Sequence, residues 1–412
     1  MPLMDLLALP ETWEAFYEYR TSLVCPKASA RELRDFIDRR AYLPVCESAA
    51  RGDPFPLPHR TVLSKTGSEK KRVVYTYPEP ENTVLKLLTW LLLRRYDGVF
   101  ADNLWSFRPG RTAKDAVRFF VSRPEIAGLW AYKADVRNYF NSVPVERLLP
   151  MLAEVTEGDP ALFAFLRRLL AEPLVLREGR PVPEEKGIMA GTPLSAFYAN
   201  LYLKDLDHRY ASAGVLYARY SDDIILFAPT EAAAKNLADG LRAELACRGL
   251  DRNPEKEALT GPAEGWTFLG FHCRGRTVDV APATAAKLKA KMRRKARALQ
   301  RWKQRSGADG ERAAAAFIRV FNRKLLESPA GSELSWKHWF FPVINTADTL
   351  REIDRYAQDC IRFLVSGKRT KARFGVRYGD LKALGYRSLV HDYYARGDEV
   401  REAADPGETA GG

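Results

Sequence analysis

Two adjacent aspartates, Asp222 and Asp223, lie inside an apolar segment and are the residues of this chain best suited to chemistry. Apolar residues precede them from position 215 and follow them to position 227. Adjacent carboxylates in a strand repel each other unless a cation holds them, and strands favour β-branched and apolar residues. A tight β-hairpin would let both carboxylates reach one cation. The segment therefore predicts a site for Mg²⁺-dependent phosphoryl transfer, with an ordinary Asp turn as the alternative.

A third carboxylate is available from the segment 131–136. Asp135 ends a short run that is mostly apolar, and Val136 follows with a backbone carbonyl that can also bind a cation. Oxygen ligands of this kind suit Mg²⁺. Phe140, five residues after Asp135, can lie beneath the sugar of an incoming nucleotide and exclude a 2′-hydroxyl. The alternative is that Asp135 caps a helix and Phe140 belongs to the core.

A glycine-containing loop opens a helix at Gly191. Thr192 and Pro193 are expected to be the N-cap and the first helical residue. Apolar residues then repeat at helical spacing from Leu194 to Leu201. Such a loop directs backbone N–H groups and the positive end of a helix dipole toward a phosphate or a base pair. Gly-Thr-Pro sequences also begin helices that bind nothing, so the loop is informative only beside the carboxylates.

Taken in order, these segments resemble a reverse transcriptase of the prokaryotic lineage that includes group II intron enzymes. The resemblance extends from Thr61 to Phe271. It is carried by the three segments above and by the Tyr-Ser-Asp-Asp string at 220–223. The other matching segments are a basic hairpin at 61–74, Ser-Phe-Arg-Pro-Gly-Arg at 106–111, Gly-Leu-Asp-Arg-Asn-Pro-Glu-Lys at 249–256 and Trp-Thr-Phe-Leu-Gly-Phe at 266–271, which is similar to a primer grip.

The resemblance implies roles for individual residues. Asp135, Asp222 and Asp223 are implied to be catalytic and, with the Val136 carbonyl, to hold two Mg²⁺ ions. Lys256 is implied to protonate the leaving pyrophosphate. The residues implied to bind the substrate are Lys65, Arg72, Phe140, Gly191 and Tyr220. Two arginines of the turn at 106–111 are implied to lie near the template and bind nucleic acid, Arg108 and Arg111.

The resemblance also implies an α+β fold, that of a right-hand polymerase. Its fingers and palm would combine an antiparallel palm sheet with helices, followed by a helical thumb and C-terminal region. We expect an N-terminal helical extension at 1–58, fingers and palm at 59–275, the thumb and C-terminal region at 276–404, and a disordered tail at 405–412. Proline residues at 54, 56 and 58 mark the end of the first part.

A strongly basic helix is expected after Pro282. It carries ten Lys and Arg residues between positions 287 and 305, with no acid among them, and an apolar stripe on one side. A merely solvated basic helix is the alternative. Beside the catalytic segments we expect a thumb that follows the backbone of a duplex, a contact that gives affinity without sequence preference. The arginines expected to bind nucleic acid are Arg293, Arg294 and Arg297.

The charge and the cysteine content fit an intracellular protein that binds nucleic acid. Among 412 residues, 65 Lys and Arg exceed 52 Asp and Glu, which gives a formal net charge of +13 and favours a polyanionic partner. The five cysteines are scattered and lack a Cys-x-x-Cys pair, so we expect no zinc site and reduced thiols in the cytoplasm. The apolar run near Leu85–Leu93 is too short to cross a bilayer, and we expect no membrane partner.

The expected activity is that of an RNA-directed DNA polymerase that adds dNTPs to a primer 3′-hydroxyl. Its partners would be an RNA template, a DNA or RNA primer and the dNTPs, with a dedicated non-coding RNA as a further candidate. The segment 378–394 is similar to tails of stand-alone bacterial enzymes linked to phage defence. Ala190 stands where the family has Gln, so a polymerase with little template guidance is one alternative; a non-catalytic RNA-binding scaffold is the other. The template, the primer and the oligomeric state remain open.

Overall fold

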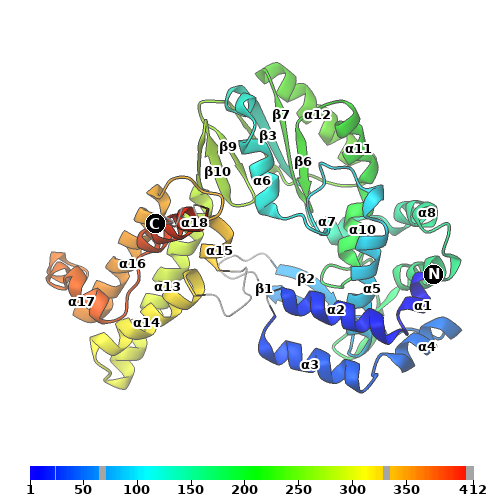
Figure 1. Cartoon of the computed structure of the whole chain (residues 1–412), viewed down its shortest axis with the longest axis horizontal. Helices are drawn as coiled ribbons and strands as arrows, with labels where there is room; N and C mark the ends of the chain where they lie inside the picture. Colours follow the sequence, from blue (N-terminus) through cyan, green and yellow to red (C-terminus); the bar gives the residue numbers. More distant parts are fainter. Residues whose placement is uncertain (24, 65–70, 328–334, 405–412) are drawn as a thin grey trace, which may run out of the picture. The chain divides into compact units, whose positions relative to one another are not determined.

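The computed structural model describes residues 1–23, 25–64, 71–327 and 335–404. Lys65 and the tail 405–412, which the sequence analysis singled out, lie outside these residues. The chain divides into two compact units, Met1–Glu264 and Gly265–Gly412 (Figure 1). The segment similar to a primer grip therefore belongs to the second unit. The four functional parts expected from the sequence stay a prediction.

The N-terminal unit contains helices and two sheets. Its α-helices are α1 Leu3–Leu6, α2 Pro10–Ser22, α3 Lys27–Asp38, α4 Leu43–Arg51, α5 Glu81–Arg95, α6 Ala113–Val121, α7 Tyr139–Ser142, α8 Val145–Val155, α9 Pro160–Ala171, α10 Ser195–Tyr202, α11 Lys204–Ser212 and α12 Glu231–Cys247. Its 3₁₀ helices are η1 Asp97–Val99, η2 Pro124–Gly128 and η3 Pro254–Lys256. Its strands are β1 His59–Ser64, β2 Lys71–Thr76, β3 Trp130–Asp135, β4 Leu174–Arg177, β5 Arg180–Pro183, β6 Tyr217–Tyr220, β7 Asp223–Ala228 and β8 Ala258–Thr260.

One sheet of this unit has the strand order β6-β7-β3-β8, with every pair antiparallel. Its two central strands are almost entirely buried, which explains why they read as apolar runs in the sequence. Helix α12 packs against β3 and β7 (Figure 1). The sheet thus provides a rigid base on which side chains at the strand ends can be positioned.

The second sheet of the unit has the order β2-β1-β4-β5. Strands β1 and β2 form an antiparallel hairpin, and so do β4 and β5, whereas β1 and β4 pair in parallel through His59 and Leu176. The helices α1, α2 and α4 pack on α5. Trp13 anchors them: it is fully buried, its ring stacks on Tyr42 at 4.6 Å, and its indole N–H donates to the Leu7 carbonyl at 2.8 Å.

The C-terminal unit combines a small antiparallel sheet with a helical bundle. Its strands are β9 Trp266–Phe268, β10 Phe271–Arg274 and β11 Thr277–Val280, and its helices are α13 Pro282–Ser306, α14 Gly310–Leu325, α15 Trp336–Phe340, α16 Asp348–Ser366, η4 Lys371–Gly375, α17 Tyr378–Ala383 and α18 Leu389–Ala404. Helix α16 packs against both α13 and α14. Its apolar stripe is buried, because residues three and four apart share one helix face.

The expected α+β class is confirmed, since antiparallel pairing dominates the sheets and helices supply the remaining layers. Within the described residues, no helix is both long and apolar enough to span a membrane. All five cysteines are free thiols. Burial raises the pKa of Cys46 to about 12 and that of Cys360 to about 12, so both stay protonated at neutral pH.

Candidate active site

A tight β-hairpin carries two of the three predicted carboxylates. In the pairing of β6 with β7, Tyr220 lies opposite Asp223, and only Ser221 and Asp222 join the strands. Ser221 has a φ of 60°, in the left-handed region that two-residue hairpin turns require. The hairpin expected from the apolar flanks is therefore present. Asp222 lies in its bend, and Asp223 is the first residue of β7.

The third carboxylate lies on the neighbouring strand. Asp135 is the last residue of β3 and is paired with Asp223 in the register of β3 and β7. Directly opposite residues of antiparallel strands place their side chains on the same face. The Val136 N–H donates to the Asp222 carbonyl oxygen at 3.0 Å and so ties the end of β3 to the bend. Three acids that are distant in sequence thus meet at one end of this strand pair.

The three carboxylates interact electrostatically. Burial raises the pKa of Asp222, the charges of Asp223 and Asp135 raise it further, and Lys256 acts in the opposite direction. Only 3% of Asp135 is exposed, so water screens these charges poorly. Repulsion between neighbouring carboxylates favours the protonated, neutral form of Asp222 unless a cation is present. The cluster is therefore held at an electrostatic cost that cations relieve.

Two lysines already supply positive charge to the cluster. The Lys256 ammonium donates to the Asp135 carboxylate at 2.6 Å, and Lys133 lies 3.3 Å from the Asp223 carboxylate. Burial alone would lower the pKa of Lys256, but the hydrogen bond to Asp135 and the neighbouring carboxylates raise it. Among the described residues, no three His, Cys, Asp or Glu side chains stand in a ready metal-binding arrangement. The lysines engage two of the three carboxylates individually.

The donor set nevertheless fits a hard divalent cation such as Mg²⁺. Carboxylate and carbonyl oxygens are the ligands that Mg²⁺ prefers, and one or two carboxylates with substrate phosphates are enough for it. Within the described part of the chain, no hydrogen bond reaches the Val136 carbonyl oxygen, so this oxygen can also bind a cation. The residues that would hold the ions are those predicted: Asp135, Val136, Asp222 and Asp223.

A buried ion pair beneath the hairpin was missed by the sequence analysis. The side chains of Arg219 and Asp207 are both fully buried, and the guanidinium donates to both carboxylate oxygens, at 2.5 Å from Nη2 to Oδ2 and 2.9 Å from Nε to Oδ1. Arg219 also donates to the Ser221 carbonyl in the bend at 3.3 Å. Tyr217 donates to Asp207 at 2.8 Å. The signal was present, because an arginine inside a buried apolar strand needs a partner.

A second network holds the bend from the other side. The Ser221 N–H donates to the Ser106 hydroxyl oxygen at 2.8 Å, and that hydroxyl donates to the Asn200 side chain at 3.1 Å. Asn200 in turn donates to the Ser106 carbonyl at 2.8 Å. The turn at 106–111 and helix α10, both recognised as motifs, are thus joined at the hairpin of β6 and β7. This contact between the two motifs and the hairpin was not predicted from the sequence.

The two arginines of that turn are engaged within the protein. Arg108 is buried and makes a two-pronged ion pair with Asp97, with distances of 2.8 and 3.0 Å. It also donates to the Ala101 carbonyl at 2.8 Å. Arg111 pairs with Asp102 at 2.6 Å and remains partly exposed. A contact of Arg108 with nucleic acid, as expected from the resemblance, would require its pairing with Asp97 to open.

The loop before α10 packs closely against Phe140 and β2. A Cβ at Gly187 would lie 2.7 Å from the Phe140 carbonyl oxygen, and one at Gly191 would lie 3.0 Å from the Tyr75 carbonyl oxygen. Both glycines have positive φ, so no other residue fits either place without strain. Ala190 is buried, and its carbonyl accepts from the Tyr75 N–H at 2.8 Å. The backbone at 190 is therefore tied to β2, and the side chain that replaces the family's Gln is buried.

The predicted start of the helix is wrong. Helix α10 begins at Ser195 with Leu194 as its N-cap, not at Pro193 with Thr192 as the cap. The Thr192 hydroxyl instead donates to the Met189 carbonyl at 3.0 Å and closes a turn. Asn141, which the sequence analysis did not consider, holds this turn in place. Its side chain accepts from the Ala190 N–H at 2.9 Å and donates to the Val73 carbonyl at 3.2 Å.

The remaining described residues that were predicted to bind the substrate are Arg72, Phe140 and Tyr220. Arg72 is exposed on β2, two residues before Val74, so its side chain lies on the same face of the strand. That face approaches the loop, since Val74 Cβ would be 3.3 Å from a Cβ at Gly191. Phe140 is half-buried at the edge of the core. Burial raises the pKa of Tyr220, which is neutral beside Asp223.

The predicted thumb arginines lie on α13 in the C-terminal unit. Arg293 and Arg297 are one helical turn apart and line a cavity that Tyr356 of α16 also lines. Arg294 is exposed and does not line this cavity. The three arginines thus do not share one face, as the spacing of adjacent residues on a helix dictates.

A family model for reverse transcriptase (RNA-dependent DNA polymerase) matches residues 63–273. This is just over half of the chain, and it spans the hairpin, β3 and the loop described above. The chain belongs to the reverse transcriptase family. The expectation of the family is confirmed. A comparison with curated proteins gave no match.

Several solved telomerase structures are similar in part. A C-terminally truncated apo telomerase from Candida tropicalis matches with 14% identity and a TM-score of 0.43, over 54% of this chain and 55% of that one. An apo telomerase from the same species matches with 12% identity and a TM-score of 0.46, over 80% and 69%. A Candida albicans telomerase with a TWJ fragment of telomeric RNA matches with 10% identity and a TM-score of 0.45, over 86% and 71%. The chain spans about half the length of the first of these.

Proposed function

We propose that this protein is an RNA-directed DNA polymerase that adds dNTPs to a primer 3′-hydroxyl. The observation that carries the proposal is the pairing of Asp135 with Asp223 across β3 and β7, with Asp222 in the adjoining bend. A member of the reverse transcriptase family with these three acids together has the ligands that two-metal phosphoryl transfer needs. Asp135, Asp222, Asp223 and the Val136 carbonyl would hold two Mg²⁺ ions. Bound there, the ions would lower the pKa of the attacking hydroxyl and stabilise charge on the leaving oxygen.

The chain's own side chains would handle the substrate. Arg72, on the face of β2 that approaches Gly191, would bind the triphosphate as a charge clamp, and Lys65 would assist it. Phe140 would lie under the sugar and exclude a 2′-hydroxyl. Lys256 carries its proton beside Asp135 and would deliver it to the leaving pyrophosphate. Its raised pKa keeps it protonated at neutral pH, in the form that carries the proton to be delivered.

The proposed partners follow from the family. They are an RNA template, a DNA or RNA primer and the dNTPs; a dedicated non-coding RNA is a further candidate. We place the enzyme in the group II intron-like lineage and in the cytoplasm, with a role in phage defence, on the motifs and tail similarity of its sequence. These are proposals beyond the family itself.

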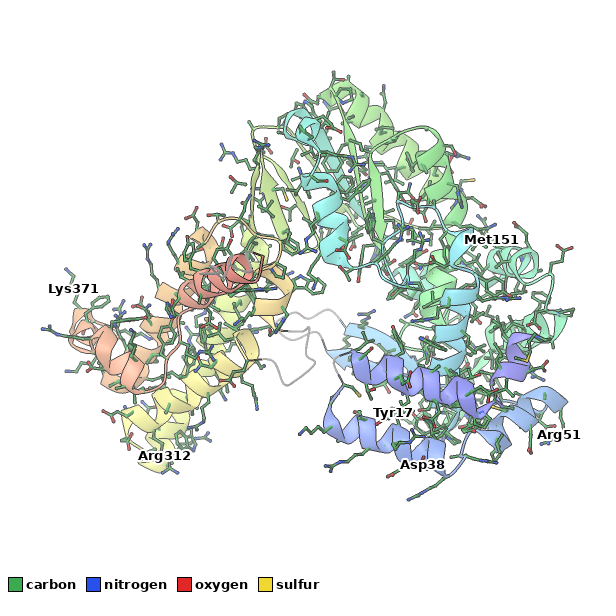
Figure 2. The ribbon with its side chains drawn as sticks, viewed as in Figure 1. Tyr17, Asp38, Arg51, Met151, Arg312 and Lys371 are labelled. Carbon is green, nitrogen blue, oxygen red and sulfur yellow. The ribbon has the colours of Figure 1, made fainter. Side chains whose placement is uncertain are left out.

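Primer extension tests the proposal. Asp222→Ala with Asp223→Ala should reduce incorporation on a primed RNA template by at least about a hundredfold, since charge-stabilising groups of this kind contribute that much or more. Asp35→Ala with Asp38→Ala on α3 is the matched control: it removes two exposed carboxylates, of which Asp38 is labelled at the surface in Figure 2, and should leave incorporation unchanged. Extension by the hairpin variant at the wild-type rate would refute the site.

A second measurement does not depend on activity. Mg²⁺ binds the folded state and should raise the melting temperature of the wild type and of the control but not that of the hairpin variant. Sequencing of the product separates templated copying from its alternative. Random or homopolymer tracts would instead favour the polymerase with little template guidance.

A further inference from the structure

The C-terminal unit contains a cavity of about 270 Å³ between α13, α16 and the segment that follows α16. Arg293 and Arg297 line it from α13, and Tyr356 lines it from α16. Arg369 and Arg373, which belong to the segment after α16, close another side. Four arginine residues therefore line one small space, and the cavity lies wholly within this unit.

Most of this positive charge is not neutralised by the protein. Asp359 is the one acid among the lining residues, and it lies 3.6 Å from Arg373. Within the described part of the chain, no carboxylate comes within ion-pair distance of Arg293, Arg297 or Arg369. The Tyr356 hydroxyl also makes no hydrogen bond to a described residue, and burial keeps it protonated by raising its pKa. These groups are donors without acceptors, which favours an anionic ligand.

Two exposed aromatic residues lie on the chain that closes the cavity. Phe374 is 51% exposed and Tyr378 is 40% exposed, which is unusual for side chains of this size. The Arg373 guanidinium lies 4.5 Å from the centre of the Phe374 ring. Arg362 of α16 donates to the Val376 carbonyl at 3.1 Å and so holds the segment on the bundle. Lys371, at the start of η4, projects outwards beside them (Figure 2).

We propose that this cavity binds a phosphate of a single-stranded nucleic acid, whose adjoining bases stack on Phe374 and Tyr378. Arginine presents its donors in a planar fork that matches phosphate, and aromatic side chains stack on any base. A duplex hides the faces of its bases, whereas a single strand leaves them free to stack, so a small cavity beside exposed rings suits a single strand better. The site is separate from the carboxylate cluster, and the proposal does not rest on polymerase activity.

Fluorescence anisotropy with the full chain tests the proposal. The probes are labelled single strands of about twelve nucleotides, one of uridines in RNA and one of thymidines in DNA, and an RNA–DNA duplex of the same length. Arg293→Ala with Arg297→Ala should weaken single-strand binding by about tenfold or more and duplex binding by less. The slope of log affinity against log salt should fall by about 0.7 for each phosphate that the variant no longer neutralises. Phe374→Ala with Tyr378→Ala should also weaken single-strand binding by about tenfold.

The matched control removes the same charge from the same helix. Arg301 and Arg305 are exposed, four residues apart on α13, and do not line the cavity. Arg301→Ala with Arg305→Ala should leave single-strand affinity within about twofold of the wild type. Equal reductions in affinity for single strand and duplex would overturn the proposal, and so would a control that binds as weakly as the cavity variant. The two single-stranded probes show whether the site prefers RNA or DNA. Melting temperatures of all variants separate impaired binding from impaired folding.

Discussion

Phe140 lies at the edge of the core, where we propose that it contacts the sugar of the substrate. It is half-buried, and its carbonyl accepts from the Ile188 N–H at 2.8 Å, so the short helix that carries it is fixed to the loop before Gly191. A bulky ring in a fixed position discriminates by contact. The half-buried position therefore supports a role in sugar selection.

We expect Phe140→Val to admit ribonucleotides. Removing the ring from an apolar pocket changes selectivity by roughly 1–3 kcal/mol, so the preference for dNTPs over NTPs should fall by at least about tenfold. The measurement is kcat/KM for each nucleotide class in primer extension. Phe163→Val is the control, because Phe163 of α9 is also half-buried against the core. An unchanged ratio in the Phe140 variant would reject the selection role.

Lys186 is a residue whose charge the fold suppresses. It has 4% of its surface exposed, and its ammonium hydrogen-bonds to the Glu172 carbonyl. Burial lowers the pKa of Lys186 to about 8, although Glu172 and Glu184 partly offset this. Between this value and the unfolded value of 10.5, the unfolded chain binds the proton more strongly. This group therefore makes the protein more stable as the pH rises through that range.

Lys186→Met should therefore change the pH dependence of stability. The variant lacks the buried charge, so its free energy of unfolding should not share the rise with pH. The difference in free energy of unfolding, variant minus wild type, should therefore fall by roughly 3 kcal/mol between pH 8 and pH 10.5. Urea unfolding at a series of pH values measures it. Lys27→Met removes an exposed lysine from α3, and its difference from the wild type should stay constant. If the difference in free energy of unfolding between Lys186→Met and the wild type also stayed constant with pH, the lowered pKa of Lys186 would be contradicted.

At the scale of elements, the hairpin that carries Asp222 and Asp223 depends on the packing beneath it. The bend places Ser221 in a strained region, and the side chains of Arg219 in β6 and of Ser106 in the turn at 106–111 hold it there. The ion pair of Arg219 with Asp207 is the centre of this support. Removing one partner of a buried pair is expensive, whereas replacing both by apolar residues is often close to neutral. Comparing a single with a double substitution can therefore separate the effect of the ion pair on stability from its effect on the position of the bend.

Asp207→Ala should lower the free energy of unfolding by about 3–5 kcal/mol, because it leaves a buried charge without a partner. Asp207→Leu with Arg219→Met should recover most of that stability. The double variant still lacks the donor to the Ser221 carbonyl, so its kcat should remain at least about tenfold low with little change in KM. Chemical unfolding and steady-state kinetics are the two measurements. Full activity in the stable double variant would show that the pair only stabilises the fold.

At the scale of the whole molecule, the pattern of the sequence predicts much of the site. The hairpin follows from the apolar flanks of Asp222 and Asp223, because two buried strands joined by two residues leave few other arrangements. Asp135 was predicted beside them because a cation site needs a further carboxylate, and its strand pairs with β7 as required. The order of motifs predicts the family, which the match to residues 63–273 confirms.

Tertiary partners could not be predicted in the same way. Nothing local in the sequence tells that Arg219 pairs with Asp207, or that Arg108 pairs with Asp97 instead of facing solvent. The start of α10 was misplaced because the Thr192 hydroxyl bonds backwards to Met189, a choice set by the packing of Asn141. The pairing of lysines with Asp135 and Asp223 could not be predicted either, because it depends on which strands become neighbours.

The strand order β6-β7-β3-β8 has a consequence for the durability of the site. Asp135 and Asp223 terminate the two inner strands, each of which is hydrogen-bonded on both sides. Inner strands open only in the largest fluctuations of a folded protein, whereas outer strands fray often. Asp135 and Asp223, two of the proposed metal ligands, should therefore keep their spacing during small fluctuations of the sheet, and thermal inactivation should require the whole sheet to unfold.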